Sequence, residues 1–171
     1  MKTLAAAAVL LAAPLAARAD IGLRLGAEAL LAHHDSSGTT LITDELHPSA
    51  NVMISYITPG SIIAFDLELS EAFRINPPAG QDMRQGTTLW PGITLSPPVI
   101  PIYVRAAVPF HLEPSPFLAG LRVGAGLTGN LLVLKLYLEA DADFPLFGGT
   151  GAPDAFSQQN ISLGAGVSFQ F

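Results

Sequence analysis

The segment LLVLKLYLEADAD, residues 131–143, alternates apolar and polar side chains from Leu134 onward. Even positions hold leucine or alanine, and the odd positions are Lys135, Tyr137, Glu139, Asp141 and Asp143. Because successive side chains of a β-strand point to opposite faces, the pattern predicts a strand with one apolar and one charged face. A soluble barrel or sandwich would bury the leucines, whereas a membrane barrel would turn them to lipid and the charges to its lumen.

The last twelve residues, NISLGAGVSFQF (160–171), show the same alternation. Apolar side chains from Ile161 to Phe171 take one face, and glycine, serine and other polar residues take the opposite face. Small residues on the polar face suit the crowded interior of a narrow barrel. This segment therefore predicts a further strand of the same barrel.

The chain after residue 19 divides into eight extended segments joined by connections that switch between short and long. Short connections carry tight-turn residues at 58–61, 96–98 and 128–130, and longer polar ones cover 33–47, 74–85, 110–116 and 145–158. An even strand count with short turns at one end and long loops at the other is typical of outer-membrane barrels. We predict an all-β fold over 20–171, an eight-stranded antiparallel up-and-down transmembrane β-barrel. The expected strands are about 20–32, 48–58, 61–73, 86–95, 99–109, 117–127, 130–143 and 159–171.

Charged side chains of both signs gather on the polar face of these strands. We predict that they form a charge network in the lumen, made of Arg24, Glu28, Asp66, Glu68, Arg105, Arg122, Lys135, Glu139 and Asp141. An eight-stranded barrel is narrow enough for side chains to fill it, and burying charges unpaired is costly. We therefore expect a structural, salt-bridged filling; a proton or ion path is the alternative.

The fourth expected strand contains Pro91, which cannot donate a hydrogen bond to a neighbouring strand. We expect a β-bulge near Trp90, Pro91 and Gly92. Aromatic residues near the strand ends predict two interface girdles, with Phe73, Phe110, Phe117 and Phe144 beside the long loops and Tyr56, Phe169 and Phe171 beside the turns.

Residues 1–19 have the composition of a cleaved secretory signal. Lys2 gives a positive start, residues 4–17 are rich in alanine and leucine, and small residues surround Arg18. A short membrane anchor is the alternative, although the stretch is too short to span a bilayer. Loss of Lys2 and Arg18 leaves six basic against fourteen acidic side chains, a formal charge of −8. Such a charge argues against nucleic acid as a partner.

The whole chain is 50% hydrophobic and 13% charged, which is more apolar than an ordinary soluble domain. No stretch after residue 20 has the roughly 18 consecutive apolar residues of a spanning helix. The absence of cysteine excludes a disulfide framework, so a continuous sheet or a large core must hold the exported chain together.

With its signal segment, eight-strand rhythm and final alternation ending in Phe171, the chain resembles the small eight-stranded outer-membrane proteins of Gram-negative bacteria, the group of the OmpA transmembrane domain and OmpX. The resemblance implies an up-and-down barrel in the outer membrane. It also implies that Phe169 and Phe171 act as the C-terminal signal read by the barrel-assembly machinery. In contrast to full-length OmpA, we expect no peptidoglycan-binding domain after Phe171.

His33, His34, Asp35 and Ser36 form a local cluster that suggests chemistry, with Glu45 and His47 further along the same expected loop. Metal sites need three or four convergent ligands, and the His34-x-Ser36 spacing of barrel lipid deacylases falls here on a loop rather than a strand. We therefore predict no catalysis, no metal and no cofactor.

The sequence predicts an outer-membrane barrel with a structural or surface-interaction role. Its expected partners are outer-membrane lipid, lipopolysaccharide and the barrel-assembly machinery, and we expect a monomer. The alternatives are a narrow pore for small solutes, a barrel lipid-modifying enzyme and a soluble periplasmic lipocalin-like carrier.

Overall fold

The structure is a computed structural model that describes residues 18–42, 46–57, 62–75, 82–97, 99–113, 117–132 and 134–170. Most of the predicted signal segment, the predicted turn at 58–61 and Phe171 lie outside these residues. Among the described residues, no helix is long and apolar enough to cross a membrane.

The described residues form one antiparallel sheet of ten strands. They are β1 (Arg18–Asp35), β2 (Gly38–Leu41), β3 (Leu46–Ile57), β4 (Ile63–Phe73), β5 (Arg84–Leu95), β6 (Ile102–Ala107), β7 (Phe110–His111), β8 (Leu118–Leu131), β9 (Leu134–Gly148) and β10 (Gln159–Gln170).

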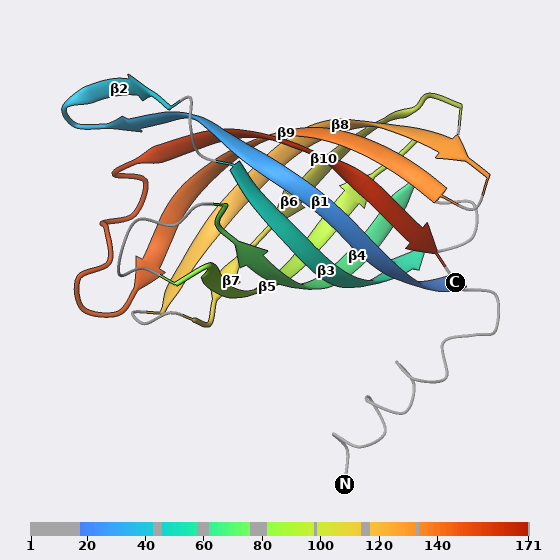
Figure 1. Ribbon diagram of the computed structural model, residues 1–171, viewed down its shortest axis with the longest axis horizontal. Helices are drawn as coiled ribbons and strands as arrows, with labels where there is room; N and C mark the ends of the chain where they lie inside the picture. The colour runs from blue at the N-terminus through green and yellow to red at the C-terminus, as the bar shows by residue number, and fades with distance from the viewer. Residues whose placement is uncertain are drawn as a thin grey trace, which may run out of the picture.

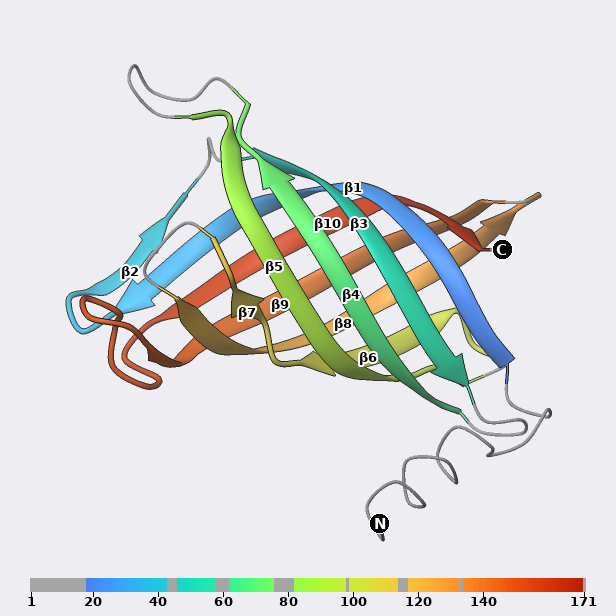
Figure 2. The ribbon, with the colours of Figure 1, turned by 90° about the horizontal axis from the view of Figure 1, so that it is seen from below.

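The sheet closes on itself because β10 pairs with β1 from Gly22↔Gln170 to His34↔Gln159. β6 and β7 pair with the same two neighbours, β5 and β8, and together form one wall strand, while β2 pairs with the end of β1. The described part of the chain is therefore an eight-stranded antiparallel barrel, as predicted. Figures 1 and 2 show its tilted strands, with the start of β1 and the end of β10 at the same end of the barrel.

The two faces of the wall differ in the predicted sense. On β9, the side chains of Leu136 and Leu138 are 41% and 43% exposed on the outside, whereas Glu139 and Asp141 are 4% and 5% exposed. The leucines therefore do not point into the barrel. A lipocalin-like carrier with an apolar interior, one of the sequence alternatives, is excluded by this arrangement.

The turn predicted at 128–130 is wrong. Those residues belong to β8, where Thr128 pairs with Tyr137 and Asn130 with Lys135, and the chain reverses between Leu131 and Leu134. The longer hairpin adds backbone pairs between β8 and β9. Its short connection places Leu132 in the left-handed region, with φ of 57°. β9 also continues to Gly148, so the loop expected from 145 begins at 149.

The first long loop, expected over 33–47, is largely strand. β1 continues through His33, His34 and Asp35, and β2 folds back on it to make a hairpin that extends beyond the barrel wall (Figure 1). A turn at 36–37 followed by Gly38, with φ of 130°, allows the reversal. The serine and glycine run marks this turn and not an extended loop.

The β-bulge expected at Pro91 is absent from the described β4–β5 ladder, which runs in register through Glu68↔Trp90, Leu67↔Pro91 and Asp66↔Gly92. On the other side, the Val108 amide donates to the Pro91 carbonyl at 2.9 Å, and strand pairing is interrupted at 108–109 between β6 and β7. The pairing of β5 with β6 and β7 therefore keeps one register across Pro91, and only the hydrogen bond that proline cannot donate is missing. Register shifts occur instead at 30–32, 72–73 and 119–120, toward the end with the long loops.

Candidate functional site

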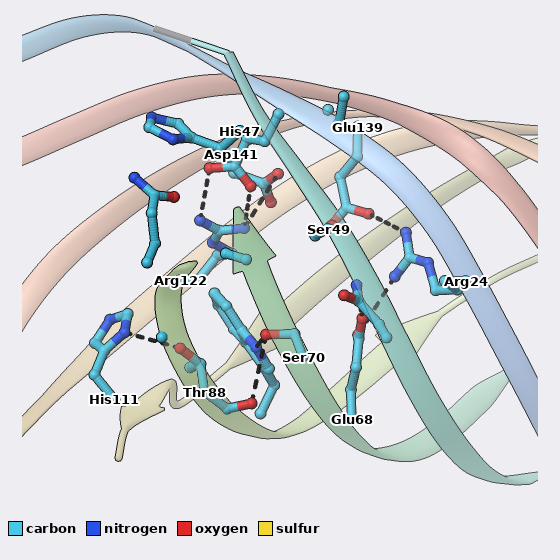
Figure 3. Close-up of a pocket in the computed structure, with 18 of the residues that line it drawn as sticks. Arg24, His47, Ser49, Glu68, Ser70, Thr88, His111, Arg122, Glu139 and Asp141 are labelled. Atoms are coloured by element: carbon cyan, nitrogen blue, oxygen red, sulfur yellow. Dashed lines mark hydrogen bonds and ion pairs between the residues drawn. The ribbon is translucent and has the colours of Figure 1, made fainter. Parts of the chain in front are cut away.

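The lumen is crossed at mid-height by a set of paired side chains that we call the central layer: Arg24, Glu68, Tyr103, Arg105 and Glu139. Glu68 lies at its centre and accepts from Arg24 Nη1 at 3.4 Å and Arg105 Nη2 at 2.6 Å. Arg24 Nη2 also reaches Glu139 Oε2 at 3.4 Å, and Glu139 accepts from the Tyr103 hydroxyl. All five side chains are buried, and they come from β1, β4, β6 and β9. Figure 3 shows Arg24, Glu68 and Glu139 of this layer. The layer therefore ties together strands on different sides of the barrel.

Arg122 organises a second cluster nearer the long loops. Its guanidinium forms paired hydrogen bonds with Glu28, at 2.9 and 3.0 Å, and with Asp143, at 2.6 and 2.7 Å. It also lies over the Trp90 ring, 4.5 Å from the ring centroid. Paired contacts of a guanidinium with carboxylates are strong and geometrically specific. The Trp90 indole is fixed in turn by a 2.6 Å hydrogen bond to Ser70.

The remaining predicted network residues lie toward the short turns. Asp66 is buried and accepts from Ser55 at 2.6 Å and Thr94 at 2.5 Å. Lys135 lines a cavity of about 150 Å³ together with Asp66. Asp66 is thus hydrogen bonded to hydroxyl groups and is not part of the central layer.

The structure brings most of the predicted network into direct contact. Glu68, Arg105 and Glu139 meet Arg24 in the central layer, and Glu28 and Asp141 approach Arg122, with Asp141 at 3.9 Å. Sequence reasoning left several polar partners out of the candidate list: Asn51, Ser55, Tyr103, Thr94, Trp90, His111 and Asp143. Their inward positions follow from the strand alternation, but their partners depend on how the strands are staggered.

Two cavities occupy the lumen between the central layer and the long loops, with volumes of about 450 and 320 Å³. They share Glu28, His47, Trp90, His111 and Arg122 among their lining residues. The larger cavity and the 150 Å³ cavity both reach Arg24, Arg105 and Tyr137. The central layer therefore lies between an upper space, toward the long loops, and a smaller lower space.

Glycines on the inner wall make room for the tyrosines of the lumen. A Cβ on Gly126 would lie 2.4 Å from the Tyr103 ring, and one on Gly26 would lie 2.0 Å from the Tyr137 hydroxyl oxygen. The Tyr137 ring also carries Arg24 on its face, 3.9 Å from the centroid. The small residues predicted on this face are thus contact surfaces for specific aromatic side chains.

The histidine cluster of the sequence does not converge on one point, although His33 Nε2 lies 3.6 Å from Asp35 Oδ2. His33 bonds Asn160 at 2.7 Å, and His34 bonds Thr39 at 2.8 Å. His47 lies on β3 and lines the upper cavities, and Glu45 is outside the described residues. Within the described ranges, no group of three histidine, aspartate or glutamate residues is arranged to hold a metal ion.

Asp35 ends β1 at the tip of the hairpin with β2. The Ser37 hydroxyl and amide both donate to its Oδ1, at 2.5 and 2.8 Å, and this holds the pKa of Asp35 below its ordinary value of 3.8. The contact closes the turn that starts β2.

A polar cluster also lies on the outer face near the long loops. Arg84 pairs with Glu71 and, at 2.7 Å, with Glu113, and Thr87 bonds Glu71 at 2.7 Å. Glu71 follows Leu67 and Leu69 along β4 at the same two-residue spacing, so it lies on the same outer face. The cluster therefore marks the upper limit of the apolar band on this side of the barrel.

Aromatic side chains occur at both ends of the wall, as the sequence suggested. Tyr56 and Phe73 are exposed at opposite strand ends, and Phe117 packs against Phe110 and Phe147 with centroids 6.2 and 6.3 Å apart. Phe169 is half-buried on β10.

The sequence matches no protein-family profile and no curated protein. A comparison with solved structures finds the crystal structure of Neisserial surface protein A, with a TM-score of 0.59 and 14% sequence identity. The match covers 91% of this chain and 99% of the Neisserial chain. At this identity the similarity is one of fold, and it extends over nearly the whole barrel.

Proposed function

We propose that this chain is an integral outer-membrane β-barrel protein with a structural or surface-interaction role and no catalytic activity. In this proposal, residues 1–19 are a signal peptide that is removed on export, and 20–171 form the barrel in the outer membrane of a Gram-negative cell. The OmpA and OmpX group provides the family comparison from the sequence. The fold shared with Neisserial surface protein A supports a place at the cell surface.

One observation carries the proposal: burial in this barrel is inverted. The buried apolar residues of the described chain are Tyr103 and four alanines, whereas eleven polar or charged residues are buried. Large apolar side chains from every wall strand are exposed instead. A continuous apolar exterior of this kind is a liability in water and is the surface that a bilayer covers.

We infer that the lumen residues serve the barrel itself. Within the central layer, and separately within the Arg122 cluster, opposite charges pair between strands that are distant in sequence. Because a barrel of this size has little room for a free channel, we expect the side chains to close it to solutes. Planar-bilayer recordings are expected to show no steady conductance; a stable open conductance would favour the narrow pore.

The partners follow from the same placement. The apolar band faces lipid, and the long-loop end faces lipopolysaccharide, while Phe169 and Phe171 are the signal for the barrel-assembly machinery. The wall is closed by β1 and β10 within one chain, which fits a monomer. The net charge of −8 after removal of residues 1–19 gives no surface for nucleic acid.

The proposal is tested by expressing the full chain in a Gram-negative host and fractionating the envelope. We expect the protein in the outer-membrane fraction, shortened at its N-terminus and soluble only with detergent. An unheated sample should migrate differently from a boiled sample on a gel, because the closed barrel resists detergent unfolding. Recovery as a water-soluble periplasmic protein without detergent would exclude the proposed function.

A further inference from the structure

Glu139 and Asp141 place two carboxyl groups side by side in the lumen. They are consecutive inward-facing residues of β9, both are buried, and a hydrogen bond joins their carboxyl groups. An ionised carboxylate only accepts hydrogen bonds, so this bond exists only while one of the two groups carries a proton. Two ionised carboxylates buried in contact would also repel each other strongly. The pair therefore holds one exchangeable proton at the wall of the lumen.

The charged groups around the pair tolerate this proton. Arg122 Nη1 lies 3.9 Å from Asp141 Oδ2, and Arg122 is already engaged by paired contacts with two other carboxylates. Arg24 contacts both Glu139 and Glu68, so it keeps Glu68 when Glu139 is protonated. The charged and titratable residues that line the lumen around the pair are Arg24, Glu28, Glu68, Tyr103, Arg105, Arg122, Tyr137 and Asp143, from β1, β4, β6, β8 and β9.

Tyr103 connects the pair with the opposite side of the central layer. Its hydroxyl donates to Glu139 Oε2. Glu139 and Asp141 line the upper cavity of about 450 Å³, whereas Tyr103 lines the lower cavity of about 150 Å³. Arginine does not release its proton in a protein, but carboxyl and phenol groups both donate and accept. Asp141, Glu139 and Tyr103 thus form an unbroken line of exchangeable protons through the central layer.

Both cavities can bring water to the ends of this line. Their volumes are well above the roughly 15 Å³ that one water molecule needs, and a buried water also needs polar partners. Glu28 and Gln85 are among the polar residues of the upper cavity, and Ser55 and Asp66 are among those of the lower cavity. Water on each side would therefore supply and accept the protons.

We propose that Asp141, Glu139 and Tyr103 form a proton relay through the lumen that passes no other ion. One proton enters the carboxyl pair from water in the upper cavity, and Glu139 donates a proton to the Tyr103 oxygen. The original hydroxyl proton of Tyr103 leaves at the same time to water in the lower cavity, so the tyrosine stays neutral and one proton leaves for each that enters. The relay rests on the membrane placement proposed above and adds an activity to it.

Proton flux into vesicles tests the relay. The full chain is refolded into phosphatidylcholine vesicles that contain a pH-sensitive dye, and a potassium diffusion potential set with valinomycin drives protons inward. We expect faster acidification than in protein-free vesicles, without entry of sodium or chloride. Flotation with the vesicles and heat-dependent gel migration establish separately that the barrel is inserted. An inserted barrel without extra proton flux would overturn the relay and leave the membrane role intact, and entry of sodium or chloride would overturn it in favour of an open pore.

Tyr103→Phe keeps the aromatic ring and removes the hydroxyl that links the two cavities. We expect it to lower the protein-dependent proton flux at least about tenfold, because proton transfer requires a donor within hydrogen-bond reach. Tyr137→Phe is the matched control: Tyr137 lines both cavities, but its ring lies against Arg24, which does not pass on a proton. Wild-type flux through inserted Tyr103→Phe, or an equal loss in both variants, would overturn the proposed line.

The proton held by the carboxyl pair has a spectroscopic test of its own. Infrared spectra of the full chain in dodecyl maltoside micelles at neutral pH are expected to show the carbonyl band of a protonated carboxylic acid. Asp141→Asn should abolish this band, because Glu139 is then an ionised partner of Arg24. Glu71→Gln, in the outer-face cluster with Arg84, is the control and should keep it. Absence of the band from the wild-type protein, or its persistence in Asp141→Asn, would refute the proposal.

Discussion

Consecutive side chains of β4 lie in two different environments. Phe65, Leu67 and Leu69 are 53%, 46% and 46% exposed on the outer wall. Asp66, Glu68 and Ser70, which alternate with them, are 8%, 2% and 6% exposed. The outer wall is apolar and exposed, and the inner wall is polar and buried.

The two walls are stabilised by different kinds of interaction. Outer side chains contribute through non-directional apolar contact with whatever covers them, so one large apolar residue can replace another. Inner side chains act through particular partners, as Glu68 does with Arg24, Arg105 and Asn51. Substitutions on the inner wall should therefore depend on the exact residue, and those on the outer wall on polarity.

The largest effect is expected on the inner wall, for Glu68→Ala. The change leaves Arg105 without its ion-pair partner and removes one of the two carboxylates of Arg24, and breaking such a buried network costs about 3–5 kcal/mol. Urea unfolding of the barrel refolded into lipid vesicles measures this loss of stability. Glu71→Ala on the outer face is the control: Arg84 is half-exposed and keeps Glu113, so the cost should stay below about 1 kcal/mol. Equal costs at the two sites would contradict the distinction between the walls.

On the outer wall, Leu67→Arg is expected to destabilise the barrel by about 2–4 kcal/mol if Leu67 lies near the bilayer midplane. Leu67 is one of the two middle residues of the outward apolar run Ile63, Phe65, Leu67 and Leu69 on β4. Leu41→Arg is the matched control, because Leu41 is exposed on β2, in the hairpin beyond the wall, and should change stability by no more than about 0.5 kcal/mol. The same vesicle-based unfolding measures both, and a neutral Leu67→Arg would argue against lipid on this face.

A smaller contrast is expected between two glycines of β8. Gly126 lies on the inner wall, where a Cβ would meet the Tyr103 ring at 2.4 Å and displace the tyrosine from Glu139, so Gly126→Ala should cost about 1–3 kcal/mol. Gly129 has nothing within 4 Å of an added Cβ, and Gly129→Ala should be neutral or stabilise by up to about 1 kcal/mol. Unfolding midpoints of the two variants in the same micelles give the comparison, which fails if both alanines behave alike.

The division between the walls could be predicted from sequence because it needs only the two-residue period of a strand. Leu136 and Glu139 lie on the faces that this period assigns to them. The partners could not be predicted in the same way. Arg24 meets Glu68 and Glu139, which lie 44 and 115 residues away, and these pairs exist only because of the stagger of the closed barrel.

The sequence predictions were wrong where turn-forming residues compete with strand pairing. Thr128-Gly129-Asn130 has turn composition, but pairing with β9 keeps it in β8. Pro91 lacks a donor, yet the ladder with β4 holds its register without a bulge. Local composition misplaced these features because the free energy of continuing a ladder depends on the neighbouring strand, which the sequence does not identify.

The smallest effect is expected in the hairpin that β1 and β2 form beyond the wall, where neither lumen nor lipid contributes. Asp35 has its pKa held below 3.8 by the Ser37 hydroxyl and amide, so its carboxylate stabilises the turn. Because the folded pKa is the lower one, this contribution is complete above pH 3.8 and is lost as the pH falls through the folded pKa.

Hydrogen exchange at the hairpin amides should therefore accelerate as the pH falls below 3.8, beyond the intrinsic pH dependence of exchange, while the wall strands remain protected. Asp35→Asn should remove this extra pH dependence, because the amide does not titrate and still offers an oxygen to Ser37. Asp154→Asn, in the connection between β9 and β10, is the control and should leave the hairpin response unchanged. If acid instead released the wall strands together with the hairpin, the turn would share the stability of the barrel, and the hairpin would have to be counted as part of its wall.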